Sequence, residues 1–156
     1  EYATNFDGIV LPAKHTLKDD VTTRLKESKF YYDNQSYGSV TTGNLTKTED
    51  WLSGSTYVDV EMEYNNLGLV TKETDSRDNN TLFEYESEDL FVSSTTNAVG
   101  YNTQFEYDYS SGQVATTTSP NGEIFVTVYD SLDRSLASYS PDPQTGSQVL
   151  VSESIY

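Results

Sequence analysis

The chain of 156 residues contains no cysteine, one histidine and one methionine. Without cysteine, a disulfide framework, a thiolate zinc site and a cysteine nucleophile are all excluded. No apolar run approaches the ~18 residues that a membrane-spanning helix needs, so we expect no membrane insertion. The chain begins with Glu1-Tyr2-Ala3, without a secretory signal pattern, and we expect it to be a piece of a longer protein.

Basic residues are also scarce. The formal net charge is −16, from 25 acidic and 9 basic residues. Such a surface repels nucleic acids and anionic membranes, which bind through basic patches, so no nucleic-acid partner is expected. The acids favour solubility, and attraction of cationic partners or divalent ions is the alternative interpretation.

Aromatic residues are what the chain has in quantity. They make up 13% of it, with 13 tyrosines and 6 phenylalanines, although only 35% of all residues are hydrophobic. Tyrosine suits a pleated, half-wet surface better than a deep core, whereas the helix formers alanine, leucine and methionine are sparse. Composition therefore predicts β-structure.

A tyrosine followed by an acidic or turn-forming residue recurs along the chain. These marker tyrosines are Tyr32, Tyr64, Tyr85, Tyr107 and Tyr129. From the second marker onward the steps are 21, 22 and 22 residues (85 − 64, 107 − 85 and 129 − 107). The first step is longer and holds an insertion at 38–56, around Trp51. Self-similarity at such a period is the signature of a repeat architecture.

Each repeat contains two turn signals. Gly100 and Gly122 lie seven residues before a marker, and Asp78 occupies the equivalent place before Tyr85. A second turn follows each of the last four markers and includes Gly68, Asp89, Gly112 or Asp133. Glycine and aspartate accept a positive φ or bond their own backbone in turns. Two turns and two strands in each unit predict consecutive antiparallel β-hairpins over residues 16–139.

The strands alternate between apolar and acidic residues. Over 58–64 the positions on the side of the marker tyrosine are apolar, whereas Asp59, Glu61 and Glu63 lie on the opposite side. This period of two predicts a sheet with the marker face covered and the acidic face open. Residues 124–129 are apolar on both sides, so we expect that strand to be covered on both faces.

The ends of the chain are less regular. Residues 1–15 are predicted to be an irregular connecting segment, and 16–32 a strand, although Leu17–Lys29 also fits a short helix. Residues 140–147 are predicted to be a loop because two prolines interrupt any hydrogen-bonded ladder. Residues 148–156 are predicted to form a further strand, the start of another repeat.

The repeating pattern over roughly residues 30–140 resembles the RHS family, also called YD repeats. The best-matching segments are Tyr107-Asp108-Tyr109-Ser110-Ser111-Gly112, Pro120-Asn121-Gly122 and Tyr129-Asp130-Ser131-Leu132-Asp133-Arg134. The pairs Tyr64-Asn65 and Tyr85-Glu86 depart from the family's Tyr-Asp. The resemblance implies an all-β, curved and spiralling sheet that forms a shell. In bacterial polymorphic toxins and insecticidal toxin complexes such a shell encloses a toxic domain, and in teneurins it is an adhesion scaffold.

The resemblance also implies where such a chain works and with what. We expect an extracellular or cell-surface protein whose partners are further repeats of the same polypeptide or like subunits, an enclosed toxin domain, or surface glycans. The alternative function is an adhesin or carbohydrate-binding module, in which Trp51 with Tyr37 or Tyr57 would stack on a sugar. The competing interpretation is that Trp51 packs against the sheet.

Catalytic chemistry has few candidates, and we expect neither an enzyme nor a cofactor. His15 stands alone in the irregular N-terminal segment, and acids in a row on one sheet face cannot oppose each other across a cleft. Asp75, Asp78 and Asn79 cluster in a turn and are candidate metal ligands, although their spacing matches neither an EF-hand nor a calcium-binding nonapeptide repeat.

Overall fold

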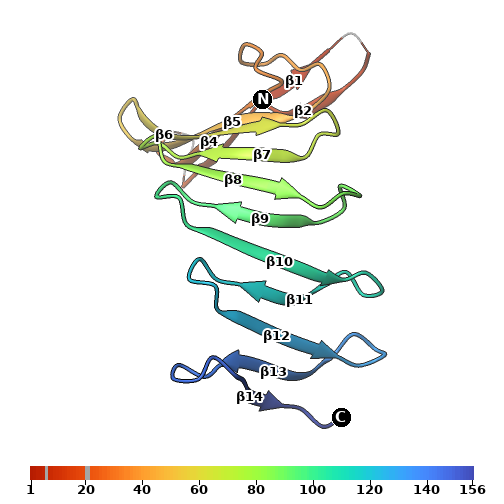
Figure 1. Cartoon of the computed structure of the whole chain (residues 1–156). Coiled ribbons are helices and arrows are strands. Elements are labelled where there is room, and N and C mark those ends of the chain that lie inside the picture. Colours follow the sequence, from red (N-terminus) through yellow and green to blue (C-terminus); the bar gives the residue numbers. More distant parts are fainter. Residues whose placement is uncertain (6, 20–21) are drawn as a thin grey trace. The chain divides into compact units, whose positions relative to one another are not determined.

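In a computed structural model, which describes residues 1–5, 7–19 and 22–156, the protein is an all-β chain (Figure 1). Strands and turns account for its regular structure, and no described residue lies in a helix. None of the described segments, accordingly, is a helix long and apolar enough to cross a bilayer. The predicted all-β class is confirmed, and the helix considered for Leu17–Lys29 is wrong for the residues described there.

The strands follow one another as antiparallel hairpins. A two-stranded sheet pairs β1 with β2, and a 12-stranded sheet runs in the order β14 to β3 without a crossover. The chain divides into two compact units, Glu1–Thr81 and Leu82–Tyr156. Their strands are β1 Tyr2–Thr4, β2 Val10–Pro12, β3 Lys14–Lys18, β4 Arg24–Tyr32, β5 Leu45–Ser53, β6 Thr56–Tyr64, β7 Val70–Thr74, β8 Asn80–Tyr85 across the boundary, β9 Val92–Thr96, β10 Asn102–Asp108, β11 Gln113–Thr118, β12 Ile124–Tyr129, β13 Ser135–Pro141 and β14 Gln148–Glu153.

A β-bulge lies opposite every marker tyrosine. Glu63 pairs with Lys72, but Tyr64 pairs with Val70, so the returning strand carries one extra residue, Thr71. The same shift recurs at Tyr32, Tyr85, Tyr107 and Tyr129. A bulge bends its strand and increases the local twist. The tyrosine therefore marks a fixed irregularity of the repeat as well as the end of its strand.

Most of the short turns between strands share one design. The first turn residue is usually Asn, Asp or Glu, and its side chain accepts hydrogen bonds from backbone N–H groups further along the turn. Asn65 Oδ1, for example, accepts from the N–H groups of Leu67 and Leu69. The fourth residue has a positive φ, and it is glycine or aspartate: Gly68, Asp78, Asp89, Gly100, Gly122 and Asp133. The two predicted turns of each repeat are confirmed.

This shared geometry predicts opposite effects for two exchanges. Asp78→Gly should raise the free energy of unfolding by about 0.5–1 kcal/mol, because it removes a Cβ at φ 62°. Gly100→Asp should lower it by a similar amount, since an added Cβ meets nothing within 4 Å and only backbone strain remains. Urea titration measures both. Ser76→Gly is the control in the Asp78 turn, and stabilisation by Ser76→Gly would contradict the φ argument.

The buried core is small and lies in the first unit. It consists of Ala3, Ala13, Tyr32 and Val40, with Ile9, Leu11, Phe30 and Leu45 packed against it. The β1–β2 hairpin provides much of this cover, so residues 1–15, expected to be irregular, contain two strands and the start of a third. Thr4 also forms a parallel bridge with Ser39 in the loop after β4.

Elsewhere the marker face is only half-covered, contrary to expectation. Val58 is 43% exposed, and Val60 and Met62 are intermediate. The expectation that residues 124–129 are covered on both faces is wrong, because Phe125 and Val128 are 40% and 42% exposed. Period-two alternation identified which residues share a face, but a single sheet layer offers nothing to bury the face against.

Three predicted boundaries change. Residues 16–32 form two strands, β3 and β4, instead of one. The extra length assigned to 38–56 lies in the loop 33–44 and in the long strands β5 and β6, which places Trp51 on a strand. In the segment 140–147, Ser140 and Pro141 still belong to β13, which pairs with β14 there.

Candidate functional site

Two of the marker tyrosines, Tyr64 and Tyr129, make the same structural contact through their hydroxyl groups. Tyr64 donates to the backbone carbonyl of Leu45 at 2.6 Å, and Tyr129 donates to that of Val114 at 2.9 Å. Both acceptors stand two residues after a glycine with a positive φ, Gly43 or Gly112. The hydroxyl thus ties the end of its strand to the beginning of the preceding strand, with which that strand pairs.

The hydroxyl of Tyr156, a residue that the sequence pattern did not single out, makes a contact of the same kind. It donates to the backbone carbonyl of Ser135 at 3.2 Å, and Ser135 stands two residues after Asp133, which has a φ of 61°. This is the relation that Tyr64 and Tyr129 show. The 27-residue step from Tyr129 (156 − 129) obscured it, because Tyr156 lies beyond the end of β14, whereas Tyr64 and Tyr129 are the last residues of their strands.

The aromatic ring of Tyr107 packs against a neighbouring aromatic ring. The ring stacks on Phe91 with centroids 4.5 Å apart and an interplanar angle of 14°. Tyr109 meets the same Phe91 edge-on, and its hydroxyl donates to Glu86. A Cβ at Gly112 would lie 3.5 Å from the Phe91 ring, so this glycine combines a left-handed φ with close aromatic packing.

Asp33, the acidic partner of Tyr32, organises the long loop 33–44. Its carboxylate accepts hydrogen bonds from the backbone N–H groups of Thr41, Thr42, Gly43 and Asn44 and from the Thr42 hydroxyl, at 2.6–3.1 Å. Burial would raise the pKa of Asp33, but the Thr42 hydroxyl and the backbone donors outweigh it and hold the pKa well below its usual range. The turn design of the short repeats is here enlarged into a carboxylate-centred loop.

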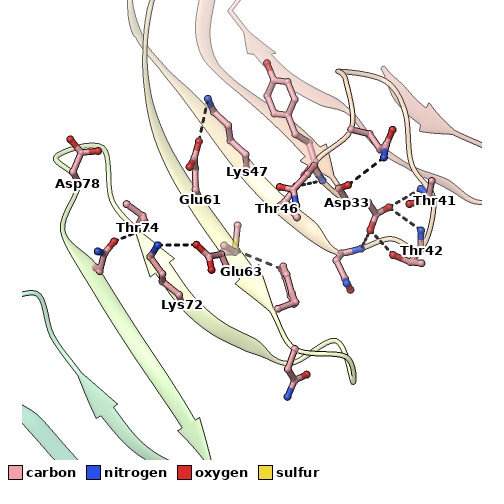
Figure 2. A pocket seen from close by; sticks show the side chains of 18 residues that line it. Asp33, Thr41, Thr42, Thr46, Lys47, Glu61, Glu63, Lys72, Thr74 and Asp78 are labelled. Carbon is pink, nitrogen blue, oxygen red and sulfur yellow. Dashed lines mark hydrogen bonds and ion pairs between the residues drawn. The ribbon is translucent and has the colours of Figure 1, made fainter.

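An open polar groove of ≈ 1110 Å³ lies beside this loop (Figure 2). Loop 33–44, β6 and β7 contribute to its lining, and Lys72 pairs with Glu63 at 2.8 Å across it. Figure 2 shows Lys47 beside Glu61, and Asp33 turned toward Thr41 and Thr42 instead of into the open space. The charged groups that line the groove are therefore largely occupied with one another.

Cross-strand ion pairs cover the acidic face of the first unit. Lys47 reaches Glu49, Asp59 and Glu61 at 3.3, 3.2 and 3.9 Å. Lys29 pairs with Glu49 at 3.2 Å. One lysine placed among three acids offsets the repulsion that directly opposed carboxylates would create. The row of acids predicted on one face is present, and lysines on the same face offset part of its charge.

Trp51 lies on the same face, where it is half-buried. The Arg24 guanidinium sits 4.2 Å from the ring centroid, and the indole N–H donates to the Gly54 carbonyl at 3.0 Å. Tyr57 pairs with Trp51 across β5 and β6, whereas Tyr37 contacts Tyr31 edge-on. Arg24 occupies a ring face that a sugar would need, so this arrangement favours packing of Trp51 over sugar stacking.

The candidate metal ligands Asp75, Asp78 and Asn79 stabilise the turn in which they lie. Asp75 accepts hydrogen bonds from the backbone N–H groups of Arg77 and Asn79 and from the Asn79 amide, and these bonds lower its pKa. Asp78 occupies the positive-φ position of the same turn. The residues that the structure describes contain no cluster of three His, Cys, Asp or Glu side chains that could hold a metal. His15 is exposed on β3 opposite Ser28.

No protein-family model matches the chain, and no curated protein matches its sequence. Two crystal structures resemble its fold. A chain of the TcdB2–TccC3–Cdc42 structure shares 18% identity at a TM-score of 0.55, over 81% of this chain and 7% of that one. A chain of the TcdB2–TccC3 structure shares 10% identity at a TM-score of 0.59, over 88% of this chain and 8% of that one.

These likenesses concern the fold alone, because both identities are low. The fold is consistent with the RHS-like repeat that the tyrosine and turn pattern resembles. The chain spans less than a tenth of the length of either matched chain.

Proposed function

We propose that the chain is a structural repeat segment of a secreted or cell-surface RHS-type protein, and that its sheet forms part of a shell around a toxin or effector domain. The observation that carries this proposal is the repeated unit of marker tyrosine, opposing bulge and side-chain-capped turn, in consecutive antiparallel hairpins. The likeness to TcdB2–TccC3 chains supports it.

The chemistry of the described residues fits a scaffold. The buried side-chain nitrogen and oxygen atoms of these residues all have hydrogen-bond partners, as in a stably packed repeat. Asp33, Asp75 and Asp130 accept hydrogen bonds from side-chain donors and from backbone N–H groups, and Glu49 accepts from Tyr31 and pairs with Lys29 and Lys47. These contacts lower the pKa values of the four carboxyl groups and make them poor proton donors. We therefore propose a non-catalytic role, with further repeats of the same polypeptide as the immediate partners.

The proposal is tested on the full gene product from which this segment comes. One site for a specific protease is inserted into the exposed turn Pro120–Gly122, and in a second variant the same site is inserted into the domain that follows the repeats. A shell predicts rapid cleavage at the turn and protection of the downstream site until the protein is unfolded. Equal cleavage of both sites in the native protein would rule out enclosure.

A further inference from the structure

The turn between β11 and β12 contains the one Asn-Gly pair of the chain, Asn121-Gly122. Asparagine is most prone to deamidation when glycine follows it, because glycine has no Cβ to shield its backbone nitrogen from the asparagine side chain. Both residues are exposed, and a Cβ at Gly122 would meet nothing within 4 Å. The surroundings of this pair therefore leave room for a reaction between side chain and backbone.

The Asn121 side chain differs from those of the asparagines that begin other turns. Asn65 and Asn97 each bind two backbone N–H groups through the side-chain oxygen, and each is followed by a residue that has a Cβ. Asn121 is the third residue of its turn, and no described residue is hydrogen-bonded to its side chain. Its amide carbon is therefore not held away from the Gly122 nitrogen.

The same turn has the weakest side-chain cap of the shared turn design. In the five other turns, the side chain of the first residue accepts from two or three backbone N–H groups. Ser119 accepts from one, that of Glu123, at 3.1 Å, and its hydroxyl also donates to the Glu123 carboxylate at 3.2 Å. The Gly122 N–H donates to the Ser119 carbonyl at 2.9 Å, which occupies the Gly122 nitrogen while the turn is closed. Opening of the turn releases this nitrogen, and a weak cap makes opening easier.

We propose that Asn121 deamidates spontaneously in the folded protein when this turn opens. The Gly122 backbone nitrogen loses its proton and attacks Cγ of Asn121. The new N–Cγ bond replaces the Cγ–Nδ2 bond, and the amide nitrogen leaves with that proton as ammonia. Water then opens the cyclic imide: attack at Cγ gives aspartate, and attack at the main-chain carbonyl gives isoaspartate. Nothing is oxidised or reduced, and water is the one co-reactant.

The reaction changes both the charge and the geometry of the turn. Either product adds a negative charge to a chain whose net charge is already −16. Isoaspartate also lengthens the main chain before Gly122, so the hydrogen bond from Gly122 to Ser119 loses its geometry. Its free α-carboxyl group makes it a substrate for methyl transfer by a protein isoaspartyl methyltransferase. The turn joins two adjacent strands of the sheet, so the change falls at a junction of the repeat.

Peptide mapping by mass spectrometry of the 156-residue chain, incubated at neutral pH, measures the reaction. The peptide that contains Asn121 should gain the mass difference between a hydroxyl and an amino group, and an isoaspartyl methyltransferase should label it. Mapping separates this site from Asp7-Gly8, an Asp-Gly pair that can isomerise without a change of mass. Gly122→Asp is the matched variant, because Asp78 occupies the same turn position at positive φ. It should slow deamidation roughly tenfold or more, since it places a Cβ beside the attacking nitrogen.

Ser119→Asp tests the role of turn opening, because it gives this turn the first residue that the turns at Asp75 and Asp130 have. It should slow deamidation of the folded chain about threefold or more, and leave the rate in the urea-unfolded chain unchanged.

Three results would each overturn the proposal. They are no mass gain at Asn121 in the folded chain while the urea-unfolded chain is converted, equal rates for the wild type and Gly122→Asp, and equal rates for the folded wild type and Ser119→Asp. The inference goes beyond the proposed function and fails separately from it, because enclosure of a downstream domain does not depend on the chemistry of Asn121.

Discussion

Replacing Asp33 with alanine is expected to lower the free energy of unfolding of residues 1–81 by about 2–3 kcal/mol. The substitution removes the acceptor for four backbone N–H groups and the Thr42 hydroxyl at once. Alanine at φ 54° adds backbone strain, because a left-handed conformation suits aspartate better. The loop that these bonds hold contributes Val40 to the core, so its release exposes core residues too.

The fluorescence of Trp51 measures this loss, because Trp51 is the single tryptophan of the chain and lies in the first unit. Asp33→Asn is the matched control. It keeps one side-chain oxygen and a residue that tolerates positive φ but removes the charge, so its destabilisation should be about half as large. If Asp33→Ala and Asp33→Asn both left the free energy of unfolding unchanged, the carboxylate would not be the group that organises the loop.

The stability difference between the wild type and Asp33→Asn should depend on pH in a definite direction. Asp33 has a lower pKa in the folded protein than in the unfolded chain, so its contribution to stability is complete above the unfolded pKa of about 3.9. The contribution is lost as the pH falls through the lower folded pKa. The stability difference between the wild type and Asp33→Asn should therefore be constant at neutral pH and shrink in strong acid. A difference that grew on acidification would contradict this assignment.

Local chemistry explains why the repeat could be predicted from the sequence. A turn with a positive φ at its fourth residue restricts that position to glycine or aspartate, and a capping acceptor restricts the first position to a few polar residues. Both signals recur in step with the tyrosine. Asp78 could therefore be equated with Gly100 and Gly122, and Asp133 with Gly68 and Gly112, across different residue types. The Tyr-Asp pair is readable for the same reason: the tyrosine ends the strand, and the acid caps the turn.

Long-range features could not be predicted in this way. The extra residue of the bulge opposite a marker is Thr71 in one repeat and Ala115 in another, so no residue type predicts the bulge. The β1–β2 hairpin was missed because its three-residue strands are too short to show alternation. The exposed marker face was missed because alternation records which side chains share a face, whereas burial depends on what is packed against that face.

Tyr32→Ala should produce the largest loss of stability of any marker substitution, about 3–4 kcal/mol. Tyr32 is 7% exposed, belongs to the core and donates from its hydroxyl to the Pro12 carbonyl at 2.7 Å. Alanine leaves a cavity beneath the β1–β2 hairpin and an unpaired carbonyl. Tyr32→Phe keeps the ring and loses the bond alone, so it should cost about 1 kcal/mol by urea titration with Trp51 fluorescence.

Substitutions of Tyr129 separate the two contributions of a marker tyrosine, the hydroxyl hydrogen bond and the burial of the ring. Its hydroxyl makes the equivalent kind of bond, to Val114, but its ring is half-exposed on the open sheet. Tyr129→Phe should therefore cost about as much as Tyr32→Phe, whereas Tyr129→Ala should cost only about 1–2 kcal/mol. Tyrosine absorbance or amide exchange in β12 measures the second unit, which lacks tryptophan. Equal losses for the two alanine variants would mean that the marker face is covered in solution, and that the buried environment of Tyr32 is the rule for the repeat.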